Sequence, residues 1–170
     1  GAKPDADILR LFRERGAFLC TTISPALPYA LFDRSVSNAS EVERYNGNVV
    51  FEGIIDCAKA ALEQDIPVVL GNDVGCPWIP QYYFHKYVGV SNAFALYTAT
   101  DRSAQLAGIG QETGTLEPGK AADLIVTAAD PLADLRALRH VELVMSHGQL
   151  HRAPQVKHRK NVEAELDRFL

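Results

Sequence analysis

The chain has 170 residues, with 17 Lys plus Arg against 21 Asp plus Glu and a formal net charge of −4. Its 47% hydrophobic and 22% charged residues exclude a disordered chain, a coiled coil and a collagen. The slight acidity argues against a nucleic-acid partner, and the apolar stretches are too short to cross a membrane. The first residues do not form a secretory signal, and three scattered cysteines suggest reduced thiols, so we expect a cytoplasmic location.

The first half of the chain alternates helical and strand patterns. The predicted elements are an amphipathic helix, a buried strand, a second helix and a second buried strand, over residues 4–15, 17–23, 40–64 and 66–71. Gly16 is typical of a helix C-terminus, and Ser40 with Glu43 matches a capping box. Residues 24–40 are predicted to form a long loop. This order predicts right-handed α/β winding with a parallel sheet.

The second half of the chain changes in character. Residues 91–107 predict a third helix, for which Ser91 is the cap. A small antiparallel β unit is then expected to begin near Ile109, with its turn, strands and hairpin over residues 114–120, 122–127, 141–145 and 148–151. Residues 161–170 predict a short terminal helix.

One carboxylate follows the second predicted strand directly. Asp73 comes after Gly71 and Asn72 in a segment rich in turn-forming residues. Ligands of α/β folds bind at strand ends, so Asp73 is a candidate site residue, although a turn former or a helix cap is the alternative. None of the histidines belongs to a His-x-His or His-Glu-x-x-His pair, so we expect none of them to be a metal ligand: His85, His140, His147, His151 and His158.

Three motifs resemble the last third of an amidohydrolase. They are a strand and turn, a helix segment, and a turn followed by a strand, at residues 68–75, 93–100 and 114–126. Their order and spacing are similar to the imidazolonepropionase and prolidase-like branch of that superfamily. The resemblance implies an α/β fold, the C-terminal segment of a (β/α)8 TIM barrel with strands 7 and 8 and their helices. It also implies part of a small β-sandwich that is assembled from both chain ends.

The resemblance also divides the chain. Residues 1–108 would form the C-terminal part of the barrel, 109–153 the β-sandwich portion and 154–170 a tail helix. The strand at 17–23 would be barrel strand seven, and the strand at 66–71 would be strand eight.

The same resemblance gives Asp73 a catalytic and metal-binding role. As the strand-eight aspartate it would contact the more buried metal, accept a proton from the metal-bound water and return it to the leaving amine. The implied cofactor is a divalent metal, expected to be zinc, with its other ligands outside this chain. Tyr29, Trp78 and Tyr82 are predicted to lie on loops, where they wall a substrate pocket or pack as lids of the core. Asp123 is expected to be structural.

The chain departs from the family pattern in two respects. It lacks the His-x-His pair after strand one, the carboxylate or carboxylated lysine near strand four, and the histidines of strands five and six. Residues 1–4 are similar to those that directly follow the strand-six histidine, so we expect the chain to begin just past the metal ligands. The connection from Trp78 to Ser91 is several residues shorter than the family pattern.

These observations lead to two hypotheses. The first is the C-terminal portion of a metal-dependent hydrolase that cleaves an amide or other C–N bond in a small molecule. Alone it would be inactive, and the missing N-terminal part of the barrel or a complementary chain would complete it, within a homo-oligomer. The second is a non-catalytic subunit or degenerate remnant that interacts with a chain supplying the rest of the barrel. We expect neither a nucleic acid nor a membrane as partner.

Overall fold

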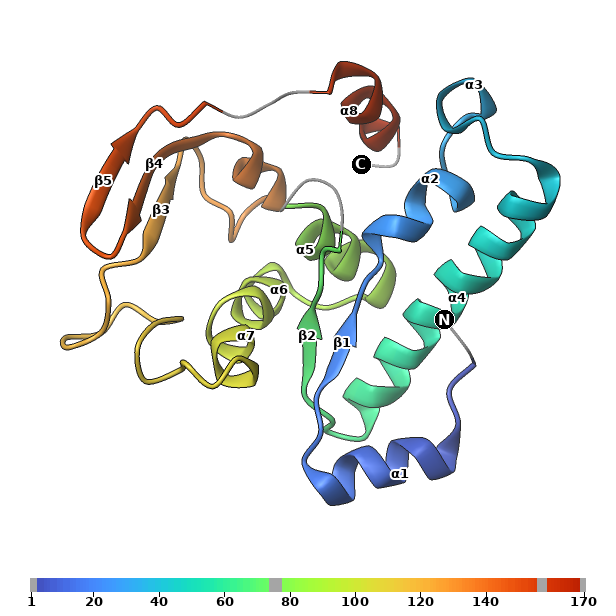
Figure 1. The fold of residues 1–170 in the computed structure, drawn as a ribbon, viewed down its shortest axis with the longest axis horizontal. Coiled ribbons are helices and arrows are strands. Elements are labelled where there is room, and N and C mark those ends of the chain that lie inside the picture. The colour runs from blue at the N-terminus through green and yellow to red at the C-terminus, as the bar shows by residue number, and fades with distance from the viewer. Residues whose placement is uncertain (1–2, 74–77, 156–158, 169–170) are drawn as a thin grey trace.

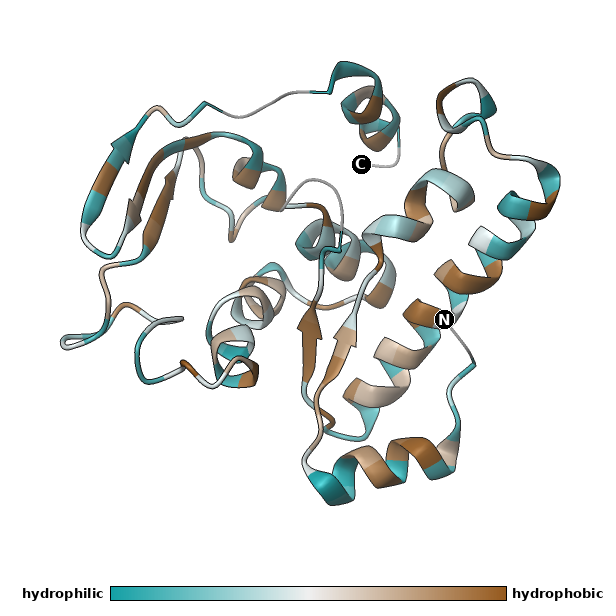
Figure 2. Cartoon of the chain, in the orientation of Figure 1, coloured by the Kyte–Doolittle hydropathy of each residue, from teal (hydrophilic) through white to brown (hydrophobic). Residues whose placement is uncertain are grey.

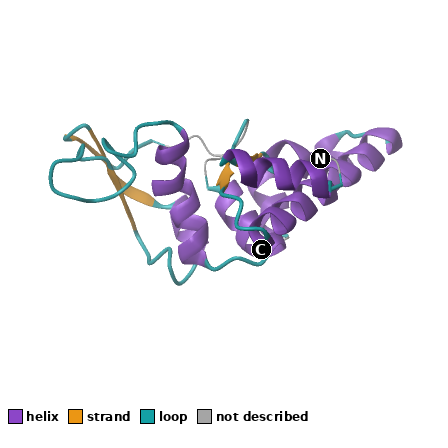
Figure 3. Cartoon of the chain, turned by 90° about the horizontal axis from the view of Figure 1, so that it is seen from below, coloured by secondary structure: helices purple, strands orange, loops and turns teal. Residues whose placement is uncertain are grey.

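The computed structural model describes residues 3–73, 78–155 and 159–168. These residues form a two-stranded parallel sheet, a three-stranded antiparallel sheet and the helices around them. Figure 1 shows the parallel strands among helices on one side of the molecule and the antiparallel sheet on the other, and the view in Figure 3 shows the same separation. The mixed α/β class is therefore as predicted.

The first half of the chain has the predicted helix, strand, helix, strand order. These elements are α1 (Ala6–Arg15), β1 (Leu19–Thr21), α4 (Glu41–Glu63) and β2 (Val68–Leu70). The strands pair in parallel, Leu19 opposite Val68 and Thr21 opposite Leu70. The predicted helix ends are confirmed as well. Gly16 ends α1 with φ 60°, and Ser40 and Glu43 form a reciprocal capping box at the start of α4.

The segment between β1 and α4 is not the long loop that the sequence predicted. It forms three short helices, η1 (Ser24–Ala26), α2 (Leu27–Ala30) and α3 (Arg34–Ser37). Its prolines stand in the first turns of η1 and α2, where a missing N–H costs nothing, so they begin helices here. The buried Leu27 and Phe32 anchor the segment in the core. At Gly47 of α4 a side chain would overlap Tyr29, so this glycine lets α2 approach closely.

Two further predictions need correction. The first strand is shorter than expected and is not buried on both faces, because the Cys20 side chain is exposed. The single helix predicted over 91–107 is two helices, α6 (Asn92–Ala99) and α7 (Asp101–Leu106). At the break, the hydroxyl of Ser103 donates to the carbonyl of Thr98 at 2.7 Å, a competing bond of the kind that weakens helix interiors. Ser91 caps α6 as predicted.

Helices from distant parts of the chain share one core. α5 (Ile79–Tyr83) continues into the π-helical turn η2 (Phe84–Val88), and α8 (Lys160–Asp167) is the predicted terminal helix. One cluster joins the β1 end, α2, α4, α5 and α8, and contains Ile23, Leu27, Phe51, Ile79, Tyr83 and Leu166. The carboxylate of Glu165 accepts the N–H of Asp33 at 2.8 Å, and this bond, with Arg168, lowers the pKa of Glu165.

The antiparallel unit consists of β3 (Leu124–Thr127), the turn η3 (Leu135–Arg139), β4 (Val141–Ser146) and β5 (Gln149–Arg152). Asp123 ties its turns together. Its carboxylate accepts the N–H of His147 at 2.7 Å and the hydroxyl of Thr113 at 2.9 Å, and these two bonds lower its pKa. This geometry fits the structural role that we expect for Asp123.

The antiparallel sheet has no covered face within the described residues. No side chain of β3, β4 or β5 is buried, and Ile125, Val126 and Leu150 are each more than 40% exposed. Figure 2 shows hydrophobic residues in brown along β3 and β4. Among the described helices, none is both long enough and apolar enough to span a bilayer.

The position of Leu166 predicts that the terminal helix depends on this one side chain. Leu166 is fully buried, and a buried leucine truncated to alanine costs ~2–5 kcal/mol. A helix of eight residues has little intrinsic stability to offset this loss. In Leu166→Ala we therefore expect the amides of α8 to lose their protection in hydrogen–deuterium exchange. Leu116→Ala, at a 73% exposed site, is the control and should leave α8 protected. Full protection of α8 in Leu166→Ala would contradict the packing described here.

Candidate functional site

The candidate site lies where the two parallel strands end. β1 and β2 run side by side in the same direction, so both carboxyl ends reach the same edge (Figure 1). The N–H of Gly71 donates to the carbonyl of Thr21 at 2.6 Å and continues the pairing past β2. Asn72 and Asp73 follow immediately. Strand ends are the usual place for ligands in parallel α/β folds, because loops can project functional groups there from a rigid sheet.

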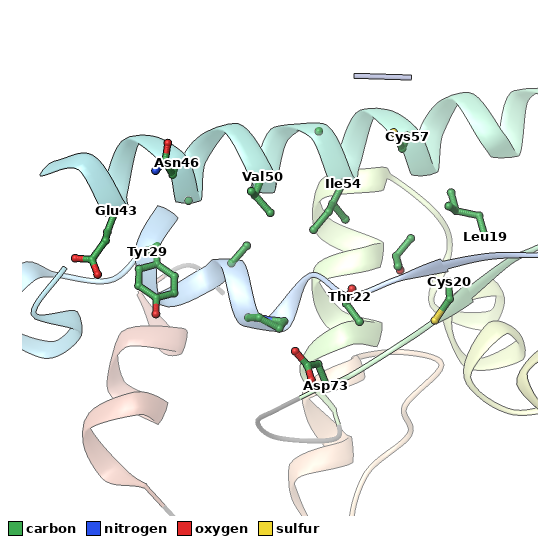
Figure 4. A pocket seen from close by; sticks show the side chains of 15 residues that line it. Leu19, Cys20, Thr22, Tyr29, Glu43, Asn46, Val50, Ile54, Cys57 and Asp73 are labelled. Atoms are coloured by element: carbon green, nitrogen blue, oxygen red, sulfur yellow. The ribbon is translucent and has the colours of Figure 1, made fainter. Parts of the chain in front are cut away.

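Asp73 presents its carboxylate to a groove. The side chain is exposed, and its backbone has the left-handed φ of 56°, which aspartate tolerates better than most residues. In Figure 4 its carboxylate points toward the segment that carries Thr22 and Tyr29. No described residue donates a hydrogen bond to this carboxylate. The described residues therefore leave the carboxylate oxygens open to a ligand from the groove.

The groove has a volume of about 630 Å³ and two walls. One wall is β1 with the following η1 and α2, and the other is a stripe along α4. Residues of this stripe recur every three or four positions, as one helix face requires. The lining of the groove, seen in Figure 4, consists of Leu19, Cys20, Thr21, Thr22, Pro25, Ala26, Tyr29, Glu43, Asn46, Gly47, Val50, Gly53, Ile54, Cys57 and Asp73.

The second carboxylate in the groove, that of Glu43, is held by hydrogen bonds at the start of α4. Glu43 accepts bonds from the hydroxyl and the N–H of Ser40, at 2.7 and 2.8 Å. Both bonds favour the ionised form and lower the pKa of Glu43. Because Glu43 is engaged in the capping box of α4, Asp73 is the better candidate of the two carboxylates for chemistry in this groove.

The structure separates the aromatic residues that the sequence grouped together. Tyr29 lines the groove with Asp73, whereas Trp78 and Tyr82 are not among the lining residues. Trp78 is 9% exposed and belongs to the core cluster, and the guanidinium of Arg139 lies 4.1 Å from the centre of its ring. The expected loop position of Tyr82 is wrong, because it lies within α5 and packs against that cluster. For both residues the geometry fits the alternative role as lids of the core.

Several lining residues were missed by sequence reasoning. Cys20 and Thr22 belong to a run that reads as buried on both faces, although their alternation with Thr21 already places them together on one face. Asn46 lies in the predicted helix 40–64, and no pattern in the sequence marks it as a site residue. Asn72, next to Asp73, accepts a hydrogen bond from Ser24 at 3.2 Å.

Asp73 can supply one metal ligand, and the described residues do not supply a set. Within the described ranges, no three His, Cys, Asp or Glu side chains are grouped so that they could hold an ion. His85 hydrogen-bonds the carbonyl of Val90 through Nδ1, and His140, His147 and His151 are exposed residues of the antiparallel unit and its entry. His158 lies outside the described residues. A zinc site usually takes three protein ligands, and the described residues bring together only one candidate ligand in the groove, Asp73, besides the capping-box residue Glu43 and the thiols of Cys20 and Cys57.

The chain is similar to known hydrolases. The profile of the amidohydrolase family matches residues 5–151. The comparison with curated proteins gave no match. Among solved structures, a protein from Bifidobacterium longum assigned as a prolidase is 34% identical over 99% of this chain, with a TM-score of 0.90. A Xaa-Pro dipeptidase with bound methionine in its active site is 26% identical over 88%, with a TM-score of 0.75. The ochratoxinase of A. niger, 21% identical over 92%, shares the fold with a TM-score of 0.73.

These similar proteins are longer than this chain. The chain spans 44% of the Bifidobacterium longum protein, 38% of the Xaa-Pro dipeptidase and 36% of the ochratoxinase.

The donor set predicts weak zinc binding by the chain alone. One carboxylate cannot replace the usual three protein ligands, so we expect less than one zinc per chain after gel filtration, measured by elemental analysis. The zinc content of Asp73→Asn should equal that of the unmodified chain within the error of the measurement. One zinc per chain retained through gel filtration would contradict the prediction and point to a ligand set within these 170 residues.

Proposed function

The chain belongs to the amidohydrolase family, and we propose that it forms the C-terminal portion of a metal-dependent hydrolase that cleaves an amide or other C–N bond in a small molecule. The observation that carries this proposal is the position of Asp73, at the end of β2, with its carboxylate open to the groove. The similar prolidase and Xaa-Pro dipeptidase favour a dipeptide that ends in proline as the substrate.

The proposed architecture places β1 and β2 as strands seven and eight of an eight-stranded barrel. Residues 1–108 would belong to the barrel, 109–153 to a small β-sandwich and 154–170 to a tail that contains α8. Supporting this, the chain matches 99% of its own length but 44% of the Bifidobacterium longum protein. The rest of the barrel, from the same protein or a complementary chain, would supply the other six strands and the other metal ligands.

Two uncovered surfaces support a missing complement. Within the described residues β1 pairs with β2 alone, so the other edge of β1 presents unpaired backbone groups. The α4 stripe beside this edge includes the exposed Val50. The antiparallel sheet, with no buried side chain, needs a second layer. Parallel sheets are covered on both faces in known folds. A further strand paired with β1, and a helix packed on that strand, would therefore cover the β1 edge and the α4 stripe.

The proposed chemistry of this chain centres on one proton. When bound, a divalent metal would polarise the scissile carbonyl and lower the pKa of the attacking water. Asp73 would accept a proton from that water as its oxygen adds to the carbonyl carbon. The same carboxyl group would give the proton to the leaving nitrogen as the C–N bond breaks, so the carboxylate is regenerated. Tyr29, on the same groove, is placed to contact the substrate.

The expectation of a non-catalytic subunit or degenerate remnant has no support in the comparisons. The similar proteins with named activities are hydrolases, and the position of Asp73 at the strand end fits a catalytic group better than a turn former. We therefore propose a catalytic role for the assembled protein, in which this chain contributes Asp73.

The proposal predicts that Asp73→Asn abolishes turnover in the complete protein, meaning this chain together with the remaining strands. The amide keeps the size of the side chain and an oxygen, but it cannot take up and release the proton. Loss of general acid–base catalysis is worth ~10²–10⁴ in rate. We expect kcat for an Xaa-Pro dipeptide to fall by roughly this factor while folding and most of the metal remain.

Asp123→Asn is the matched control for that substitution. It removes the same charge from a carboxylate that holds turns of the antiparallel unit. We expect a lower melting temperature and a nearly unchanged rate per folded molecule. Near-normal turnover of Asp73→Asn would leave Asp73 as a turn former and refute the catalytic assignment.

The uncovered surfaces predict that the isolated chain associates. Its open β1 edge and apolar α4 stripe should recruit other chains, so sedimentation should show aggregates or a complex with the complementary segment. The alkylation rate of the exposed Cys20 thiol measures how accessible this surface is. The measurement uses a Cys57→Ala, Cys76→Ala background, so that Cys20 is the cysteine that reacts. We expect iodoacetamide to modify it at least tenfold more slowly in the complete protein, because the added strands would bury it.

A cysteine at an exposed site of α3, Ser35→Cys in a Cys20→Ala, Cys57→Ala, Cys76→Ala background, is the control. It lies outside the groove and the antiparallel sheet, so it should react at similar rates in both forms. Two results would contradict the proposed complement. One is a monodisperse monomer that melts cooperatively, and the other is an equal rate of Cys20 modification in the two forms.

A further inference from the structure

Asp73 has an uncommon backbone conformation. It adopts the left-handed conformation, in which side chains other than glycine are disfavoured. Its own side chain makes no hydrogen bond to a described residue that would hold this conformation. Among the described residues, those just before Asp73 can constrain the direction of its carboxylate.

Gly71 provides the first constraint. Its N–H bonds the carbonyl of Thr21 at 2.6 Å. A side chain at this position would stand 2.8 Å from Cγ2 of Thr22 and 2.9 Å from Sγ of Cys20. The end of β2 thus crosses closely beside two residues that line the groove. This contact holds the end of β2 close to β1 at the residue two positions before Asp73.

Ser24 and Asn72 provide the second constraint. Ser24 is 6% exposed, and its hydroxyl donates to the side-chain oxygen of Asn72 at 3.2 Å. Ser24 begins η1, so its position is set by the same short helix that contributes Pro25 and Ala26 to the groove wall. The bond joins the end of one strand to the residue before Asp73 on the other.

From this geometry we infer that Ser24 and Asn72 are positioning residues that aim the Asp73 carboxylate into the groove. The inference rests on the proposed function, because it assumes that Asp73 carries the proton. It adds that the hydrogen bond between two strand ends, and not the aspartate alone, determines whether the carboxylate reaches the reacting atoms. Supporting residues of this kind typically change activity or metal affinity 10–100-fold when they are removed.

The test uses the complete protein and an Xaa-Pro dipeptide as the probe. Ser24→Ala and Asn72→Ala should each lower kcat by roughly 10–100-fold, with KM within about threefold of the wild type. The double variant should lose little more than Asn72→Ala alone, because that substitution already removes the bond to Ser24. Ser24→Thr, which keeps the hydroxyl, should restore most of kcat.

The solvent deuterium isotope effect on kcat should rise in the alanine variants, because a misplaced carboxylate slows proton transfer.

A second readout does not depend on turnover. In metal-free protein, Ser24→Ala should speed amide hydrogen exchange at residues 71–73 by about fivefold to tenfold, the effect of losing one hydrogen bond. Ser35→Ala is the matched control. It removes a serine hydroxyl that bonds Asp33 at 2.7 Å in the same segment, outside the lining of the groove. It should leave kcat, the isotope effect and exchange at 71–73 unchanged.

The outcomes separate the inference from the proposed function. Unchanged kcat in both alanine variants, or equal losses in Ser35→Ala, would overturn the positioning role. So would a loss of kcat accompanied by an unaltered isotope effect and a matching fall in melting temperature, because that pattern reports general destabilisation. An active Asp73→Asn, or a complete protein that hydrolyses no C–N bond, would instead refute the proposed function.

Discussion

The parallel pairing of β1 with β2 is the constraint on which the candidate site depends. It brings two segments, separated by the whole length of α4, to one edge, and there it places Asn72 and Asp73 beside η1. Gly71 allows this approach because any side chain would meet Cys20 and Thr22. The groove follows from the same pairing, since α4 must return along the sheet to connect two parallel strands. The pairing of β1 with β2 thus determines both the position of the Asp73 carboxylate and the groove that it faces.

The same pairing explains why this chain presents so much unpartnered surface. The two short parallel strands contact α4, α6 and α7, yet among the described residues β1 keeps an open edge and an exposed Cys20. The antiparallel sheet repeats the situation at the other side of the molecule, with no buried side chain among its strands. Both surfaces would be covered by further strands in the longer proteins that the chain resembles. Under the proposed function, the groove would be part of a larger interior.

Local rules in the sequence were sufficient for much of the fold. Gly16 and the pair Ser40 and Glu43 mark helix ends through backbone chemistry that needs no tertiary information. The segment 24–40 was misread because its prolines suggest a loop, whereas burial of Leu27 and Phe32 turns them into helix starts. For the site, Asp73 was predictable from its place after a strand. The bond between Ser24 and Asn72 was not, because only the strand pairing brings residues 48 positions apart into contact.

The central claim is that Asp73 is this chain's contribution to a metal site shared with the rest of a barrel. The most direct measurement is anomalous scattering at the zinc edge from crystals of the complete protein. The account predicts a peak about 2.0–2.2 Å from a carboxylate oxygen of Asp73, with the remaining protein ligands outside these 170 residues. A fully occupied zinc whose ligands exclude Asp73, or a set of ligands drawn entirely from this chain, would contradict it.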